Sequence, residues 1–222
     1  MAIPITVTLT HYKRIDLLQQ TIESFMRTNL YPISEFIIVD DSGDKSYSDK
    51  IIELYSNKIR VIVNDENIGQ RRSIDRLLQE SNNDYIFHLE EDWLFEGTEP
   101  QSYIEDSIRI LENNKNIHQV HIRHQNDDPH PTIGDDCYID NIGYKFLDNN
   151  FRGVWNGFSF NPGLRRKSDL HRMFPNGLIE FKDEMAAAIH VRKFNYCAVR
   201  LTRTVCRHIG YEHGTQTGGR GF

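Results

Sequence analysis

Residues 5–44 read ITVTLTHYKRIDLLQQTIESFMRTNLYPISEFIIVDDSGD, and this stretch decides the fold. The apolar runs at residues 5–9 and 36–39 are short, which predicts two buried strands. Between them Leu18, Ile22 and Phe25 recur at the i, i+4, i+7 spacing of one helix face. The order of strand, helix and strand indicates parallel strands joined by a helical crossover.

The same unit repeats along the chain. Further strands are predicted at residues 60–63, 85–89, 119–122 and 196–201. Further helices are predicted over residues 45–55, around Ile74 and Leu77, around Ile104 and Ile108, and over residues 181–193. Near-continuous Ile and Val strands separated by helices indicate an α/β domain with a mostly parallel sheet covered on both faces. Ligands of such sheets bind at the carboxyl ends of the strands.

Two segments depart from this pattern. Residues 124–151 are polar, which favours a substrate-facing insertion or a mobile loop over a packed element. Residues 210–222 contain five glycines, which predicts a flexible tail.

Composition bounds the classes of partner. The 222 residues are 38% hydrophobic and 26% charged, as in ordinary globular proteins. Lys and Arg number 26 against 32 Asp and Glu, so the chain lacks the basic excess of a nucleic-acid-binding protein. No apolar run approaches the roughly 18 to 20 residues that span a bilayer, and we expect a cytoplasmic protein. The three cysteines favour neither a disulfide framework nor a thiolate zinc site.

Three predicted strands end in polar motifs. THYKR (residues 10–14) lacks the GxGxxG turn of a dinucleotide-binding Rossmann domain. DDSGD (residues 40–44) suits either a turn that binds a base or ribose, or an ordinary Asx or Gly turn. NIGQRR (residues 67–72) brings a glycine and two guanidinium groups to a helix start, which can hold phosphate or be a solvated basic turn.

The fourth strand ends in HLEEDW (residues 88–93), whose three adjacent carboxylates we call the acidic run: Glu90, Glu91 and Asp92. These carboxylates would repel one another unless a cation is present. Oxygen ligands select Mg²⁺ or Mn²⁺, either of which can bridge a carboxylate and a diphosphate. A solvated acidic loop is the alternative.

These four strand ends, in this order and spacing, resemble the GT-A fold glycosyltransferases, especially the large inverting group that uses nucleotide-diphosphate sugars. The resemblance covers residues 3–93 and continues to about residue 210. The family's IVDDGS-like turn is met by residues 38–44, with serine and glycine inverted, and its DxD element by the acidic run, with glutamate first. It implies donor contacts from Thr10, Tyr12, Arg14, Asp40, Asn67, Gly69, Arg71, Arg72, Glu90 and Glu91.

The resemblance also implies a metal and a general base. The metal position maps onto Asp92, and RHIG (residues 207–210) resembles the family's late metal-binding histidine element, which selects His208 with His213 as a competitor. The acidic pair Asp183 and Glu184 lies at a predicted helix start. The spacing from this pair to the basic residues 192–193 and to Tyr196 selects Glu184 as base, with Asp183 as its rival.

On the acceptor side, Trp155 and Phe158 lie in VWNGFSFNPGL (residues 154–164). Their rings suit stacking on a sugar face, or a place in the core beside a turn.

The sequence therefore predicts a Mn²⁺- or Mg²⁺-dependent glycosyltransferase with a nucleotide-diphosphate sugar donor, uridine being the expected base. The acceptor is a hydroxyl group, and inversion is expected, with retention open. We expect a single GT-A domain over residues 1–222, with a nucleotide-sugar half at about 1–123, an acceptor half at about 124–209 and a tail at 210–222. The alternatives are a non-catalytic nucleotide-sugar or glycan-binding protein, and a nucleotidyltransferase or metal phosphohydrolase on a similar sheet.

Overall fold

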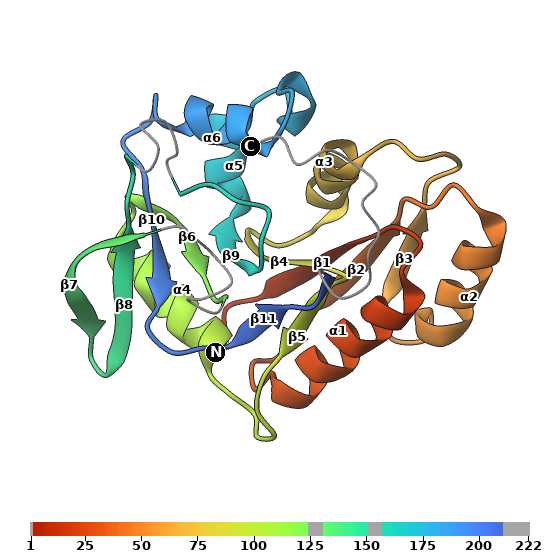
Figure 1. Ribbon diagram of the computed structural model, residues 1–222, viewed down its shortest axis with the longest axis horizontal. Coiled ribbons are helices and arrows are strands. Elements are labelled where there is room, and N and C mark those ends of the chain that lie inside the picture. The colour runs from red at the N-terminus through yellow and green to blue at the C-terminus, as the bar shows by residue number, and fades with distance from the viewer. Residues whose placement is uncertain (1, 124–130, 151–156, 211–222) are drawn as a thin grey trace.

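The computed structural model describes residues 2–123, 131–150 and 157–210 (Figure 1). The described residues form a nine-stranded sheet in the order β3-β2-β1-β4-β9-β6-β10-β8-β7. Its strands are β1 (Ile5–His11), β2 (Glu35–Asp40), β3 (Arg60–Val63), β4 (Tyr85–Glu90), β6 (Ile117–His121), β7 (Thr132–Ile139), β8 (Ile142–Leu147), β9 (Gly163–Arg166) and β10 (Cys197–Leu201). A two-stranded sheet pairs β5 (Trp93–Phe95) with β11 (Cys206–His208).

Helices cover both faces of the large sheet. They are α1 (Ile15–Thr28), α2 (Lys45–Tyr55), α3 (Gln70–Glu80), α4 (Tyr103–Asn113), α5 (Lys167–Met173), the 3₁₀ helix η3 (Leu178–Glu180) and α6 (Glu184–Val191). Strand residues alternate between the faces. In β2, Phe36 and Ile38 belong to the core that holds α1, α2 and α4, whereas Ile37 packs with Leu77 of α3. In Figure 1, α3, α5 and α6 gather above the sheet and α1 lies below it.

The first four strands behave as the sequence predicts. β1 pairs in parallel with β2 and with β4, and β2 pairs in parallel with β3. The register sets His11 opposite Asp40 and Thr10 opposite Glu90. Because parallel strands end at the same edge, the polar motifs after β1, β2, β3 and β4 meet there.

The second half makes the sheet mixed. β9 runs antiparallel between β4 and β6, and β8 pairs antiparallel with both β10 and β7. For the polar segment 124–151 the sequence favours a substrate-facing insertion or a mobile loop. Its described part is not a loop, because residues 132–147 hold the two strands of a hairpin. Many side chains of β7 are exposed, so this edge strand carries no apolar signal.

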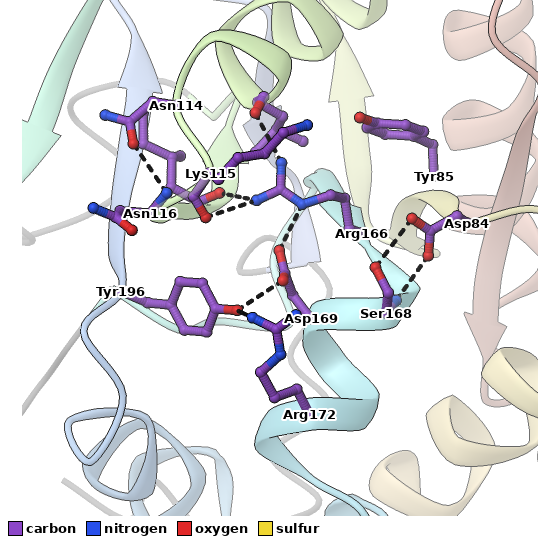
Figure 2. A network of polar contacts seen from close by, with 12 residues as sticks. Asp84, Tyr85, Asn114, Lys115, Asn116, Arg166, Ser168, Asp169, Arg172 and Tyr196 are labelled. Atoms are coloured by element: carbon purple, nitrogen blue, oxygen red, sulfur yellow. Dashed lines mark hydrogen bonds and ion pairs between the residues drawn. The ribbon is translucent and has the colours of Figure 1, made fainter.

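A buried polar network anchors β9 (Figure 2). The guanidinium of Arg166 donates to three carbonyl oxygens: that of Leu111 in the last turn of α4, that of Lys115 just after this helix, and that of Ile117 at the start of β6. Its Nε donates to Asp169 Oδ2 at 2.6 Å, and Tyr196 donates to the other oxygen of that carboxylate at 2.7 Å. The network therefore ties β9 and α5 to α4, β6 and the start of β10.

Within the described residues, no helix is both long and apolar enough to cross a membrane. The predicted tail from residue 211 onward lies outside the described residues.

Candidate active site

The turn after β2 is organised by Asp40, which is buried. Its Oδ1 accepts from His11 Nδ1 at 3.0 Å and Ser42 N at 3.1 Å, and its Oδ2 accepts from the hydroxyls of Ser42 and Ser48. Burial opposes ionisation, but the hydrogen bonds from His11, Ser48 and Ser42 outweigh it and lower the pKa of Asp40. Both oxygens are thus engaged within the protein, which supports the Asx-turn interpretation of this residue.

Asp41 shapes the entry to α3. Its carboxylate accepts from Asn64 Nδ2 and Ile68 N, both at 2.8 Å, and from Gly69 N at 2.9 Å. Gly69 has φ +85°, in the left-handed region that disfavours side chains, and its Cα faces open space. It begins α3 without a side-chain cap, and Arg71 and Arg72 follow in the first turn. The first turn of α3 therefore offers amide and guanidinium donors to an anion.

The acidic run follows β4 and is fixed by α1. Thr21 Oγ1 donates to Glu91 O at 2.7 Å and accepts from Trp93 N at 3.1 Å. Arg14 forks across two of the carboxylates: Nη2 lies 2.6 Å from Glu91 Oε1, and Nη1 lies 2.8 Å from Asp92 Oδ2. Glu91 and Asp92 are both buried, so Arg14 is a close counter-charge to each.

Asp92 also lies beside His208. Pairing of β5 with β11 sets His208 opposite Trp93, and His208 Nε2 lies 3.2 Å from Asp92 Oδ2. A Cβ added at Gly210 would stand 2.5 Å from the same oxygen, so only glycine leaves this space open. Burial would raise the pKa of Asp92, but His208 and Arg14 outweigh it and lower this pKa.

A carboxylate oxygen and an imidazole nitrogen at this separation fit two neighbouring ligands of one divalent ion, whose other ligands would come from a diphosphate and water. Among the described residues, no group of three or more His, Cys, Asp and Glu side chains is arranged to hold a metal. Asp92 and His208 are thus a two-ligand candidate, whose remaining ligands would be water in the nucleotide-free protein and diphosphate oxygens once a donor is bound.

Glu90 stands apart from the Arg14 fork. Its carboxylate accepts from Gln70 Nε2, at the start of α3, and from Trp93 Nε1 at 3.4 Å. Burial, followed by the charges of Asp92, Glu184 and Glu91, raises the pKa of Glu90 to about 8. A perturbed carboxyl at a strand end is typical of a functional site.

The two members of the acidic pair have different roles. Asp183 is the N-cap of α6: it is extended, and its side chain accepts from Ala186 N at 2.8 Å. Glu184, in the first turn, does not cap the helix. Its Oε1 accepts instead from Phe160 N at 3.3 Å. Both residues line a pocket of about 580 Å³, together with Gly69, Arg71 and Arg72 at the start of α3.

Arg165, which the sequence analysis did not single out, links this pocket to the acidic run. It is on β9 and 3% exposed, with Nη2 donating to Asn161 O at 3.2 Å. Burial lowers the pKa of Arg165 to about 10 against the opposing charges of Glu184 and Glu90. A buried arginine within a strand does not appear in an apolar pattern. The only hint in the sequence is that Arg165 follows directly after Gly163 and Leu164.

His11 was missed as well. Its Nε2 accepts from Arg14 N at 3.2 Å, so its proton is on Nδ1, which donates to Asp40. His11 thereby connects the Asp40 turn to the residue that holds the acidic run.

The remaining predicted residues lie as follows. Thr10 is buried at the end of β1, Tyr12 is 38% exposed, and Asn67 is exposed before α3. Phe158 is fully buried against Phe160 and Phe174, so neither face of its ring is open, and this position argues against the predicted acceptor contact. Trp155 and His213 lie outside the described residues.

A model of glycosyl transferase family 2 matches residues 6–174. The chain belongs to this family. No curated protein matches its sequence.

Solved structures give the GT-A fold. TarS 1–349 of S. aureus is similar at TM-score 0.63 and 13% identity, over 96% of this chain and 61% of that one. A mannosyltransferase of Pyrobaculum calidifontis, PcManGT, in complex with GDP-Man and Mn²⁺, is similar at TM-score 0.65 and 15% identity, over 96% of this chain and 59% of that one. TarS 1–349 in complex with UDP-GlcNAc is similar at TM-score 0.61 and 14% identity, over 93% of this chain and 58% of that one. This chain thus spans about six tenths of the length of these solved chains.

Proposed function

We propose that this family 2 glycosyltransferase moves a sugar from a uridine-diphosphate sugar to an acceptor hydroxyl, with inversion, and that Glu184 is its general base. The observation that carries the proposal is geometric. Glu184 lines the same pocket as Gly69, Arg71 and Arg72 at the start of α3, and its charge also acts on Glu90, at the end of β4, and on Arg165, on β9. A carboxylate that is not used as a helix cap therefore faces the same strand edge as the acidic run.

The donor would lie along the carboxyl edge. Thr10, near the end of β1, and Tyr12, directly after that strand, would contact the base and ribose together with Glu90. The first turn of α3, with Asn67, Arg71 and Arg72, would bind the diphosphate through its amide and guanidinium donors. Arg14 and Glu91 would hold the floor of the site, and Asp40 would act by shaping the turn beside the base.

Asp92 and His208 would hold a divalent ion, Mn²⁺ or Mg²⁺. When bound, such an ion supplies positive charge where negative charge develops on the leaving diphosphate. The GDP-Man and Mn²⁺ complex of the archaeal mannosyltransferase supports this assignment.

In the transfer step, the acceptor oxygen forms a bond to the anomeric carbon while the bond from that carbon to the diphosphate oxygen breaks. Glu184 takes the hydroxyl proton as the new bond forms. The base and the leaving group lie on opposite sides of the sugar in this arrangement, so the anomeric configuration inverts.

The test is a panel of uridine, guanosine and thymidine diphosphate sugars with and without Mn²⁺. A donor at a hundred times its Kd should stabilise the protein by about 2.7 kcal/mol, which is about 5–10 °C in Tm for this size. We expect the uridine sugars to do so in Mn²⁺ and to be turned over with an acceptor. Failure of all three bases to bind would refute the donor site. Tight binding with no turnover against any hydroxyl acceptor would favour the non-catalytic alternative.

A further inference from the structure

Arg14 occupies the place where the metal-free protein needs a cation. It lies between β1 and α1, where its side chain caps nothing, and it reaches the turn after β4. Three of its donors are used there: Nε and Nη2 on Glu91 Oε1, at 2.8 and 2.6 Å, and Nη1 on Asp92 Oδ2, at 2.8 Å. Burial would lower the pKa of Arg14, but the charges of Glu91 and Asp92 outweigh it and raise this pKa.

The atom that Arg14 shares with His208 is the one a metal would use. Asp92 Oδ2 lies 2.8 Å from Arg14 Nη1 and 3.2 Å from His208 Nε2, so both of its lone-pair directions are engaged. A divalent ion bound to Oδ2 would also be within a few ångströms of the guanidinium, and such a like-charge contact is strongly unfavourable at a buried site. We expect this repulsion to break the contact between the guanidinium and Oδ2 when a metal is bound.

Glu91 provides the means to release only one of these contacts. It holds Arg14 through two donors, Nε and Nη2. Movement of Nη1 away from Asp92 leaves the Nε and Nη2 contacts available, so the side chain can stay in place on Glu91.

We propose that Arg14 is the resident counter-cation of Glu91 and Asp92, and that a divalent metal binds Asp92 only by displacing Arg14 from Oδ2. The proposal rests on the metal assignment of the proposed function and adds a competing group within the protein. It predicts that removal of Arg14 strengthens metal binding, which is opposite to the effect of removing a ligand.

The experiment measures Mn²⁺ binding to the nucleotide-free protein by the electron paramagnetic resonance signal of free Mn²⁺. The variants are Arg14→Gln, Arg14→Lys and the control Arg207→Gln. Arg207 precedes His208 on β11 and is partly exposed, and its ion pair is with Glu96 at 3.4 Å, so the control removes the same charge without touching Asp92.

We expect Arg14→Gln to lower the Kd for Mn²⁺ about tenfold or more, and Arg207→Gln to change it about twofold or less. Arg14→Lys, which keeps the charge and loses the fork, should fall between wild type and Arg14→Gln. Without metal, Arg14→Gln should have a lower Tm than wild type, and Mn²⁺ should raise that Tm more than it raises the wild-type value.

An unchanged or weakened Kd in Arg14→Gln would overturn the proposal, as would equal tightening in Arg207→Gln. If Arg14→Gln does not fold without metal, recovery of its circular dichroism on adding Mn²⁺ supports the proposal, and no recovery overturns it. Absence of Mn²⁺ binding in every variant overturns it too. Donor binding is measured separately by calorimetry with uridine diphosphate in a chelator and in Mn²⁺, so failure of the donor site is recognised independently of this competition.

Discussion

Glu184→Gln is the variant on which the proposed mechanism depends most. The amide keeps an oxygen that can accept from Phe160 N, so we expect a Tm within about 1 °C of wild type. It cannot take the acceptor proton, so kcat should fall by about 10²- to 10⁴-fold, which corresponds to about 2.7–5.5 kcal/mol of barrier. Donor affinity should change little.

Asp183 provides two matched controls. Asp183→Asn removes the same charge one residue away and keeps a good cap, so Tm and kcat should stay near wild type. Asp183→Ala removes the acceptor of Ala186 N, which should cost about 1 kcal/mol, or about 2–4 °C in Tm, with kcat unchanged in the folded protein.

The assay is release of nucleoside diphosphate at saturating donor and acceptor, with donor affinity measured by calorimetry and Tm by fluorescence. Full activity in Glu184→Gln together with a loss in Asp183→Asn would show that the wrong carboxylate was selected. Full activity in both would refute a base from this pair.

Three further outcomes follow from the same geometry. Arg165→Met removes the positive charge near Glu184 and should move the acid limb of the kcat profile to higher pH, whereas Arg165→Lys should not. The other charged groups near Glu184, namely Glu90, Arg71, Arg72, Lys182 and Asp183, are common to both variants, so coincident profiles would refute a role for the Arg165 charge. The pKa of Glu90 is raised from 4.5 in the unfolded chain to about 8 in the folded protein, so the contribution of Glu90 to stability should fall as pH rises through this window. Glu90→Gln should remove that fall. Relative to wild type, its free energy of unfolding in urea should be higher by up to about 4 kcal/mol more at pH 8 than at pH 5. An equal increase at both pH values would contradict the assignment. Phe158→Ala should cost about 3–5 kcal/mol of unfolding free energy and leave the acceptor KM of the folded protein unchanged, while a raised KM would restore Phe158 to the acceptor site.

The first half of the fold could be predicted because each strand is an apolar run and each helix has one apolar face. The helix expected around Ile74 is α3, and residues 45–55 are α2 as predicted. Since parallel strands share an edge, the pattern also located the acidic run and the start of α3 at one site.

The sequence analysis missed the elements that have no apolar pattern of sufficient length. β9 carries Arg165 and Arg166, both buried. Some of their partners are distant in sequence: the carbonyl oxygens of Leu111 and Ile117 for Arg166, and the charges of Glu184 and Glu90 for Arg165. β5 and β11 are three residues each, too short for a periodic signal. The expected helix at 181–193 is shorter, because Asp183 caps it. The different roles of Asp40, in the turn after β2, and Asp41, at the entry to α3, could not be predicted from the sequence either. They depend on which backbone amides each carboxylate reaches.

The two consecutive arginines of β9 explain how a carboxylate on α6 can be held relative to the acidic run on β4. Successive side chains of a strand point to opposite faces of the sheet. Arg166 fixes the strand from one face, through carbonyl oxygens of the last turn of α4 and the start of β6 and through the carboxylate of Asp169 (Figure 2). Arg165, on the other face, then has a defined position between the charges of Glu90 and Glu184. A buried positive charge fixed in this way lets two carboxylates approach one another, and it favours the ionised form that a general base requires.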